Sequence, residues 1–282
     1  MLEKELETAI LLAKSAGESI LRYYALEIIE EEKIGIDSFS EPVTAADREA
    51  SRIITAGLAA AFPADGILSE EEIDDSETRL ASSRVWIIDP IDGTAGFIKK
   101  DGDFCVQIGL VENGIPVLGV VLLPARNAFY YAVKGAGSYI VENDGTPVRM
   151  QVSGETDFSA MNLAVSRNHG SKNMQRIVRS FRFRKEVQRG SVGLKVGLIT
   201  ERICDLYVHL SPRTKFWDTC GPQIILVEAG GTMTDIFGRP LRYNLDDVQN
   251  HNGIFASNGT SHEAAVKKLR PILEDIGRRQ LH

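Results

Sequence analysis

Two blocks of hydrophobic residues with helical spacing open the chain. In residues 2–24, apolar side chains recur every three or four positions, which predicts an amphipathic helix. A second block with the same period extends to about residue 61, where Phe62-Pro63 ends it. The segment 40–47 before this block is turn-like, and Thr44 and Asp47 are both suited to cap the second helix.

The pattern then changes to short apolar runs with strand character. Residues 66–69 and 85–88 are two such runs, and each is followed by acidic residues. Residues 103–111 and 115–123 alternate between apolar and polar positions and are joined by Asn113-Gly114, a strong hairpin signal. Strands at 128–133 and 138–141 and a turn at 143–145 continue this meander. The polar segments 30–33 and 74–83 are expected to be solvated connections. The first half is therefore predicted to hold two helices and a largely antiparallel sheet.

The second half alternates between strand and helix patterns, which is typical of α/β folds. The predicted strands are 163–166, 185–188, 205–209 and 253–256, and the predicted helices are 171–180, 194–203, 218–229 and 261–276. Gly230-Gly231 is a suitable C-terminal cap for the third of these helices. We place a boundary near residues 145–160, which gives an α+β half at 1–150 and an α/β half at 151–282.

The composition excludes several classes of protein. Hydrophobic residues make up 43% of the 282 residues, enough for a large core. The net charge of −7, with no block of Lys or Arg, argues against a nucleic-acid polymer as partner. The three cysteines form no CxxC pair, and their odd number argues against a disulfide framework. The charged N-terminus does not resemble a signal peptide, and no apolar run is long enough to span a membrane. We therefore expect a cytoplasmic protein without a membrane partner.

The turn after the strand at 85–88 carries the first candidate chemistry. Asp89 and Asp92 flank Pro90-Ile91, and Gly93-Thr94 follow. Because proline has no N–H to donate, the strand is expected to end near residue 88 and to leave both carboxylates at the sheet's carboxyl edge, where α/β proteins bind ligands. Two close carboxylates are costly unless a cation neutralises them or one takes up a proton. The alternatives are therefore a divalent metal site and a simple Asx turn that ends the strand.

Two further acidic residues have suggestive surroundings. Glu70 follows the strand at 66–69, so it is predicted to reach the same sheet edge as Asp89. Asp218 follows Phe216-Trp217 and opens an apolar helix, where it is suited to serve as an N-cap carboxylate and also to bind metal. Taken singly, each of these carboxylates is better explained as a solvated surface group or a helix cap.

Four motifs in this chain together resemble one known superfamily. They are Trp86-Ile87-Ile88-Asp89-Pro90-Ile91-Asp92-Gly93-Thr94, Trp217-Asp218-Thr219-Cys220-Gly221 through Glu228-Ala229-Gly230-Gly231, Ser69-Glu70-Glu71, and Pro42-Val43-Thr44-Ala45-Ala46-Asp47. They resemble the signatures of the lithium-sensitive, magnesium-dependent phosphomonoesterases of the inositol monophosphatase superfamily. That superfamily includes inositol monophosphatases, bisphosphate nucleotidases and fructose-1,6-bisphosphatases. The resemblance covers roughly residues 17–259, with the motifs in the family's order.

The resemblance implies a fold and a set of roles for individual residues. The implied fold is a layered α-β-α-β-α sandwich, and the implied cofactor is Mg²⁺, with two or three ions. The implied metal ligands are Glu70, Asp89, Asp92, Asp218 and the carbonyl of Ile91, with Asp47 helping to hold a third ion. Thr94 and Glu70 would position the attacking water. The amides of Gly93 and Thr94 would hold the phosphate. Mg²⁺ prefers oxygen ligands, and paired ions suit in-line displacement at phosphorus. Lithium inhibition is likewise implied, and the family allows for a homodimer.

No protein nucleophile is needed for this chemistry, and the histidines agree with that. The five histidines are scattered along the chain, without the spacing of a zinc site.

Three local features favour the bisphosphate nucleotidases within the superfamily. Residues 96–104 resemble the segment that follows the Asp-Gly-Thr turn in those enzymes, although Ala95-Gly96 stands where Lys-Glu is common. Residues 190–195, with Ser191 and Lys195, resemble the segment that contacts the second phosphate and the ribose. Ser166-Arg167-Asn168-His169 is similar to their Ser-Arg-Ser-His. Lys195 would suit an extra phosphate or else be a solvated lysine at a helix start, and Arg167 would pair with phosphate or with a surface carboxylate.

The leading hypothesis is the hydrolysis of a small phosphorylated metabolite. We expect 3′-phosphoadenosine 5′-phosphate to be converted to AMP and phosphate, which clears a by-product of sulfate assimilation. An inositol monophosphatase is the main alternative, and a fructose-1,6-bisphosphatase is a weaker one. A catalytically silent metal- or phosphate-binding regulatory protein is the non-enzymatic alternative. Such a protein would be expected to lack a ligand carboxylate or the threonine, and this chain retains them all.

Overall fold

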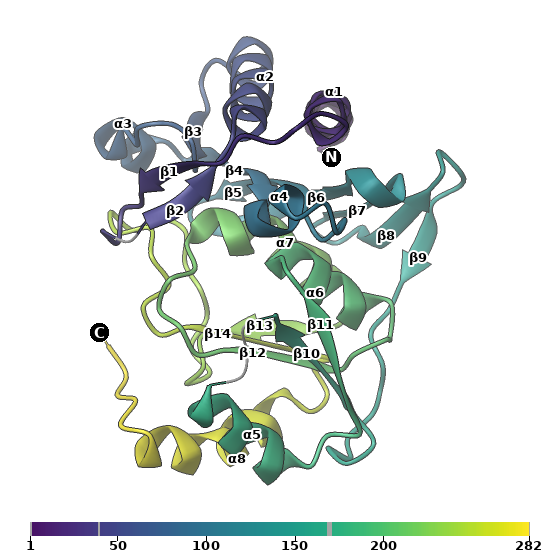
Figure 1. The fold of residues 1–282 in the computed structure, drawn as a ribbon, viewed down its shortest axis with the longest axis vertical. Coiled ribbons are helices and arrows are strands. Elements are labelled where there is room, and N and C mark those ends of the chain that lie inside the picture. The colour runs from purple at the N-terminus through teal and green to yellow at the C-terminus, as the bar shows by residue number, and fades with distance from the viewer. Residues whose placement is uncertain (1, 39, 168–170, 282) are drawn as a thin grey trace.

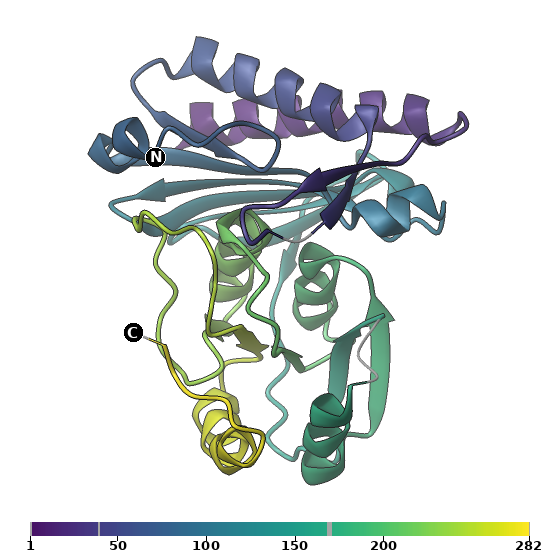
Figure 2. The same cartoon turned by 60° about the vertical axis from the view of Figure 1, so that its left-hand side comes forward.

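The computed structural model describes residues 2–38, 40–167 and 171–281 and shows five stacked layers of alternating helices and sheets (Figure 1). In order, the layers are the helices α1 and α2, a seven-stranded sheet, α6 with α7, a five-stranded sheet, and α5 with α8 (Figure 2). The layered α-β-α-β-α sandwich is therefore confirmed. Among the described residues, each helix is too short or too polar to cross a lipid bilayer.

The long helices lie close to the predicted positions, and two short helices, α3 and α4, are additions. The bounds are α1 (Glu3–Tyr24), α2 (Ala45–Ala61), α3 (Ser76–Ala81), α4 (Thr94–Ile98), α5 (Lys172–Phe181), α6 (Val192–Thr200), α7 (Phe216–Glu228) and α8 (His262–Asp275). Helix α3 lies in a segment predicted to be a surface connection. Asp75 begins it by accepting a hydrogen bond from the Thr78 amide at 3.1 Å. A helix of six residues is too short to show a hydrophobic period.

The large sheet is antiparallel except at one edge. Its order is β3 (Gly66–Ser69), β4 (Arg84–Asp92), β5 (Cys105–Glu112), β6 (Ile115–Leu123), β7 (Ala128–Val133), β8 (Gly137–Glu142) and β9 (Val148–Met150). Only the β3–β4 pair among these is parallel. The predicted hairpin at Asn113-Gly114 is confirmed, and both residues have positive φ, 50° and 76°.

The small sheet is mixed and belongs to the second half of the chain. Its order is β11 (Lys185–Arg189), β10 (Asn162–Ser166), β12 (Leu206–His209), β14 (Ile254–Ser257) and β13 (Thr232–Thr234). The chain leaves the large sheet at Met150 and enters the small one at Asn162. The division into domains at 1–150 and 151–282 stays a prediction.

The segment around residues 30–43 differs from its prediction. It forms a two-stranded antiparallel hairpin of β1 (Glu31–Ile34) and β2 (Ser40–Val43), where a solvated run and a turn were expected. Strand β1 is largely exposed and β2 becomes buried only at Val43, so neither shows the apolar alternation that identifies a half-buried strand.

Strand β4 also differs from its prediction, because it does not end at Pro90. It continues to Asp92, and its pairing with β5 shifts register between Asp89 and Asp92. An irregularity of this kind accommodates a residue without an N–H. In a regular strand, two side chains three positions apart would point to opposite faces. The irregularity therefore allows Asp89 and Asp92 to point toward one another.

Helix α7 packs unusually close to the large sheet. A Cβ placed on Gly119 of β6 would lie 2.5 Å from the carbonyl oxygen of Gly221 in α7. A Cβ on Gly109 of the neighbouring β5 would collide with the Cys220 sulfur. These glycines let α7 approach the sheet, and the approach fixes the position of the first turn of α7 over the end of β4.

We expect Gly119→Ala to destabilise the protein by about 1–3 kcal/mol, because the added methyl group meets helix backbone that cannot rotate away. Urea unfolding of the wild type and the variant measures this difference. Gly154→Ala is the matched control, since a Cβ there meets nothing within 4 Å, and it should change stability by less than about 0.5 kcal/mol. Equal midpoints for both variants would contradict the close-approach argument.

Candidate metal centre

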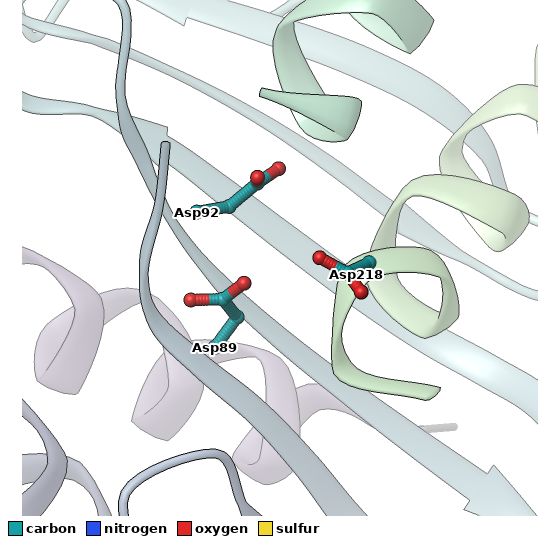
Figure 3. Close-up of side chains that lie close together, drawn as sticks. All are labelled: Asp89, Asp92 and Asp218. Carbon is teal, nitrogen blue, oxygen red and sulfur yellow. The ribbon is translucent and has the colours of Figure 1, made fainter. Parts of the chain in front are cut away.

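Three carboxylates from distant parts of the chain meet where the two halves face each other. Asp89 and Asp92 come from β4 and Asp218 from the first turn of α7, and one oxygen from each lies within 4.8 Å of the others (Figure 3). Asp89 is fully buried and Asp92 nearly so, while Asp218 is partly exposed. The structure therefore brings together three of the four carboxylates that the sequence pointed to as close ligands.

This concentration of charge changes how the carboxylates bind protons. Burial, followed by the charges of Glu70 and Asp92, raises the pKa of Asp89 well above its usual value. Burial also raises the pKa of Asp92 to about 6, although the charge of Lys195 and the amides of the α6 N-terminus oppose the increase. The group thus resists full ionisation unless positive charge is supplied.

Asp218 occupies a different capping position from the one predicted. The N-cap of α7 is Lys215, and Asp218 lies three residues into the helix. Its Oδ2 accepts a hydrogen bond from the Lys215 amide at 2.6 Å. This hydrogen bond fixes the carboxylate and leaves its other oxygen toward Asp89 and Asp92 (Figure 3).

Glu70 follows β3, as predicted, and is held by a lysine that sequence analysis missed. The Nζ of Lys33 on β1 lies 3.0 Å from Glu70 Oε1 and also pairs with Glu71. Burial tends to lower the pKa of Lys33, but the charges of Glu70 and Glu71 raise it above the usual value. No sequence signal distinguished Lys33, because β1 is an exposed polar strand.

Asp47 and Thr94 form a second group beside the three carboxylates. The Thr94 hydroxyl lies 3.3 Å from Asp47 Oδ1 and 3.1 Å from the carbonyl oxygen of Ile91. Thr44 is the N-cap of α2, as predicted, and both its amide and its hydroxyl donate to Asp47 Oδ2. Asp47 itself lies three residues into the helix, where it completes the capping box with Thr44. Burial raises the pKa of Asp47 to about 6.

The donor set fits a hard divalent cation. The converging groups are all oxygens, from carboxylates, a hydroxyl and the Ile91 carbonyl, which is the set that Mg²⁺ prefers. In addition, Asp89 Oδ1 is buried and has no hydrogen-bond partner in the described part of the chain. A buried acceptor without a donor is costly, and a bound cation would remove that cost.

The turn after β4 joins this centre to a cavity. Gly93 has φ of 97°, and a Cβ there would lie 2.6 Å from the carbonyl oxygen of Asp103, so only glycine fits. Gly93 is the N-cap of α4 and lines a cavity of about 510 Å³. Lys99, Ser166, Arg167 and His209 line it too, and its volume suits a small ligand.

Two of the predicted substrate residues reach the cavity, and one cannot be placed. Ser166 and Arg167 lie on its wall. Arg167 pairs with Asp101 and, at 2.6 Å, with Asp103, so it forms the ion pair that the sequence left open as an alternative to phosphate. His169 lies outside the described residues.

Lys195 and Ser191 are buried at the start of α6. The solvated alternative for Lys195 is wrong, since the residue is 1% exposed and its Nζ lies 5.0 Å from the centre of the Tyr207 ring. Burial lowers the pKa of Lys195 to about 8, while the charges of Asp92 and Asp218 act in the opposite direction. The Ser191 hydroxyl accepts a hydrogen bond from the Leu194 amide at 2.9 Å, which makes it the cap of α6.

A buried glutamine next to the carboxylates was also missed. Gln107 of β5 donates from its side-chain amide to Asp92 Oδ2. The signal that could have identified it is its polarity within Cys105-Val106-Gln107-Ile108, an otherwise apolar buried strand.

Comparison with known proteins supports the geometric result. The sequence model of the inositol monophosphatase family matches residues 1–274. The chain is 36% identical over 241 residues to the 3′(2′),5′-bisphosphate nucleotidase CysQ of Salmonella typhimurium, covering 84% of this chain and 93% of that protein. It is 34% identical over 240 residues to the CysQ of Aggregatibacter actinomycetemcomitans, covering 85% and 87%.

Solved structures of the same kind superpose closely on this chain. The inositol monophosphatase of Thermotoga maritima gives a TM-score of 0.81 at 29% identity, covering 97% of this chain and all of that one. CysQ from Bacteroides thetaiotaomicron, described as a bacterial member of the inositol monophosphatase family, gives a TM-score of 0.75 at 31% identity, covering 91% and 98%.

The raised pKa values predict how pH and metal affect stability. The carboxyls of Asp47 and Asp92, with pKa values of about 6, stabilise the metal-free fold while they are protonated, below the unfolded pKa of about 3.9. That contribution is lost as pH rises through about 6, and a divalent cation then restores it. We therefore expect Mg²⁺ to raise the melting temperature more at about pH 7.5 than at about pH 5.

Thermal melts with Mg²⁺ and with a chelator, at both pH values, measure this effect. Asp92→Asn should reduce the Mg²⁺-induced increase at the higher pH, because it removes one charge from the cluster. A wild-type melting temperature that is the same with Mg²⁺ and with chelator at about pH 7.5 would contradict the metal assignment.

Proposed function

Because the chain belongs to the inositol monophosphatase family, we propose that its acidic centre hydrolyses the 3′-phosphate of 3′-phosphoadenosine 5′-phosphate to give AMP and phosphate. The chain is a metal-dependent phosphoric monoester hydrolase. The observation that carries the proposal is the cluster of Asp89, Asp92 and Asp218 beside a cavity of about 510 Å³. The substrate assignment rests on the likeness to the CysQ nucleotidases over most of the chain.

The metal would be held by the residues that converge at the end of β4. They are Glu70, Asp89, Asp92, Asp218 and the carbonyl of Ile91, with Asp47 beside a third ion. When bound, Mg²⁺ supplies a Lewis acid that lowers the pKa of water and stabilises both the entering and the leaving oxygen of an in-line displacement.

The remaining groups bind and orient the reactants. We propose that Thr94 and Glu70 orient the attacking water. Thr94 is fixed for this role by its contacts with Asp47 and with the Ile91 carbonyl, at 3.3 and 3.1 Å. The amides of Gly93 and Thr94 open α4, where the first N–H groups have no acceptor within the helix, so they suit the phosphate oxygens.

The second phosphate of the substrate requires positive charge on the far side of the cavity. Arg167 lines the cavity, and we propose that it contacts this phosphate together with Ser166 and His169. Lys195 is buried and does not line the cavity, so we propose that it contributes a positive charge that acts on Asp92 and Asp218. Ser191 holds the start of α6 and with it the position of Lys195.

Other activities of the superfamily are less well supported. An inositol monophosphatase would use the same metal chemistry, but the relatives that match at 31–36% identity are nucleotidases. Fructose-1,6-bisphosphatase activity has no observation in its favour beyond the shared superfamily. A catalytically silent regulatory protein is disfavoured because the chain retains every predicted ligand. The carboxylates of Asp89, Asp92 and Asp218 also converge in the structure.

We also propose the metal, the cellular location and the oligomeric state of the enzyme. Mg²⁺ is the expected metal, with two or three ions, because the donors are hard oxygens. We further propose a cytoplasmic location, and the family resemblance implies a homodimer. Lithium sensitivity belongs to the same set of proposals.

We expect turnover of 3′-phosphoadenosine 5′-phosphate to exceed that of inositol 1-phosphate and of fructose 1,6-bisphosphate, because the cavity offers cationic residues for a second phosphate. Phosphate release with Mg²⁺ across these substrates measures the preference as kcat/KM. Arg167→Met should narrow this preference, because it removes a cavity charge proposed to contact the second phosphate and so lowers kcat/KM only for the bisphosphate nucleotide. Equal or better turnover of inositol 1-phosphate by the wild type would contradict the nucleotidase assignment.

Asp92→Asn should abolish turnover with little loss of folded structure, since it removes a ligand charge but preserves the shape of the side chain. Activity at saturating Mg²⁺ and the circular dichroism spectrum measure the two effects separately. Asp144→Asn is a matched control, because Asp144 pairs with Lys14 on the surface and away from the centre. An unchanged rate for Asp92→Asn would refute the metal assignment.

A further inference from the structure

Gln107 is a polar side chain buried at the middle of the large sheet. It lies on β5 directly opposite Asp89 of β4 and is 1% exposed. Its neighbours along the strand, Val106 and Ile108, are fully buried apolar residues. A buried amide is costly unless it is hydrogen-bonded, so the position needs a reason.

One end of the Gln107 amide is committed to Asp92. Its nitrogen donates to Asp92 Oδ2, which also accepts the Gly193 amide of α6 at 3.0 Å. The Cys105 sulfur lies 3.9 Å from the same oxygen. The Gln107 side chain and the Gly193 amide thus both hold Oδ2 of Asp92, the same oxygen that Cys105 approaches.

The other end of the Gln107 amide has no partner. Its Oε1 is buried and receives no hydrogen bond from the described residues, and the same is true of Asp89 Oδ1 on the facing strand. Two unpaired acceptors on directly opposite residues indicate a place where a donor or a cation is needed.

A purely structural role explains only half of this arrangement. It would account for the bond to Asp92, but it would leave Oε1 buried and unsatisfied, which an apolar residue of the same shape would avoid. The glutamine is accounted for at both ends only if a ligand occupies the site next to Asp89.

We propose that Gln107 is a positioning residue of the metal centre. Its nitrogen, with the Gly193 amide, holds Asp92 Oδ2 so that Oδ1 faces the ion, and its Oε1 accepts a hydrogen bond from a water molecule of the site. The role deepens the proposed function and rests on Asp92 as a metal ligand. Partners that orient metal ligands commonly affect metal affinity by ten- to a hundredfold.

Gln107→Met tests the proposal, because methionine has a similar shape but no hydrogen-bonding amide. We expect the Mg²⁺ concentration for half-maximal activity to rise by about tenfold or more. The Mg²⁺ dissociation constant from titration calorimetry should rise by a similar factor. At saturating Mg²⁺, the KM for the nucleotide should be unchanged, because Gln107 does not line the substrate cavity.

Ile108→Val is the matched control, since it trims the next residue of β5, which faces the opposite side of the sheet. It should lower the urea midpoint of the metal-free protein and leave the Mg²⁺ affinity unchanged. If Gln107→Met behaves in the same way, its role is structural and the proposal is overturned. If wild-type protein itself binds no Mg²⁺, the metal assignment fails as well, so the calorimetric titration separates the two failures.

Discussion

The repulsion among buried carboxylates is the constraint on which this structure depends. Asp89, Asp92 and Asp218 occupy a space where three negative charges cannot coexist without compensation, and Glu70 adds a fourth nearby. The protein supplies part of the compensation itself. Lys33 pairs with Glu70, amides of α6 and Gln107 bind Asp92, and the Lys215 amide binds Asp218. The negative charge that these contacts leave unbalanced favours the binding of a cation at this place, and the chemistry of the site follows from that.

The fold meets this constraint by small departures from regular structure. The irregular pairing of β4 turns Asp89 and Asp92 toward each other, and the glycines under α7 bring Asp218 within reach of both. Helix α6 contributes its N-terminal amides and is buried along its whole length between the two sheets. The site therefore forms where the layers pack against each other, and the packing of β4, α6 and α7 around it depends on backbone atoms as well as on side chains.

Sequence analysis predicted most helices and strands from strong local signals, whereas the layered fold and the ligand set came from the resemblance carried by contiguous motifs. The helical period of α1 and α2 and the Asn113-Gly114 hairpin depend on near neighbours in the chain, and the motif around Asp89 is contiguous. Pro90 misled the prediction because a proline usually ends a ladder, whereas here a shift in register accommodates it. Lys33 and Gln107 were missed because their roles arise only through contacts with distant residues. The burial of Lys195 had a signal that went unused, since an almost wholly apolar helix such as α6 is buried on all sides.

The position of Asp218 in the chain has a consequence for biosynthesis. Glu70, Asp89 and Asp92 leave the ribosome long before α7, and in the finished fold α7 lies between the large and the small sheet. A nascent chain that has made only the large sheet would thus carry the carboxylates of β4 without Asp218. The cluster of three carboxylates is complete only once α7 has packed against the large sheet, so folding of the first half alone does not assemble it.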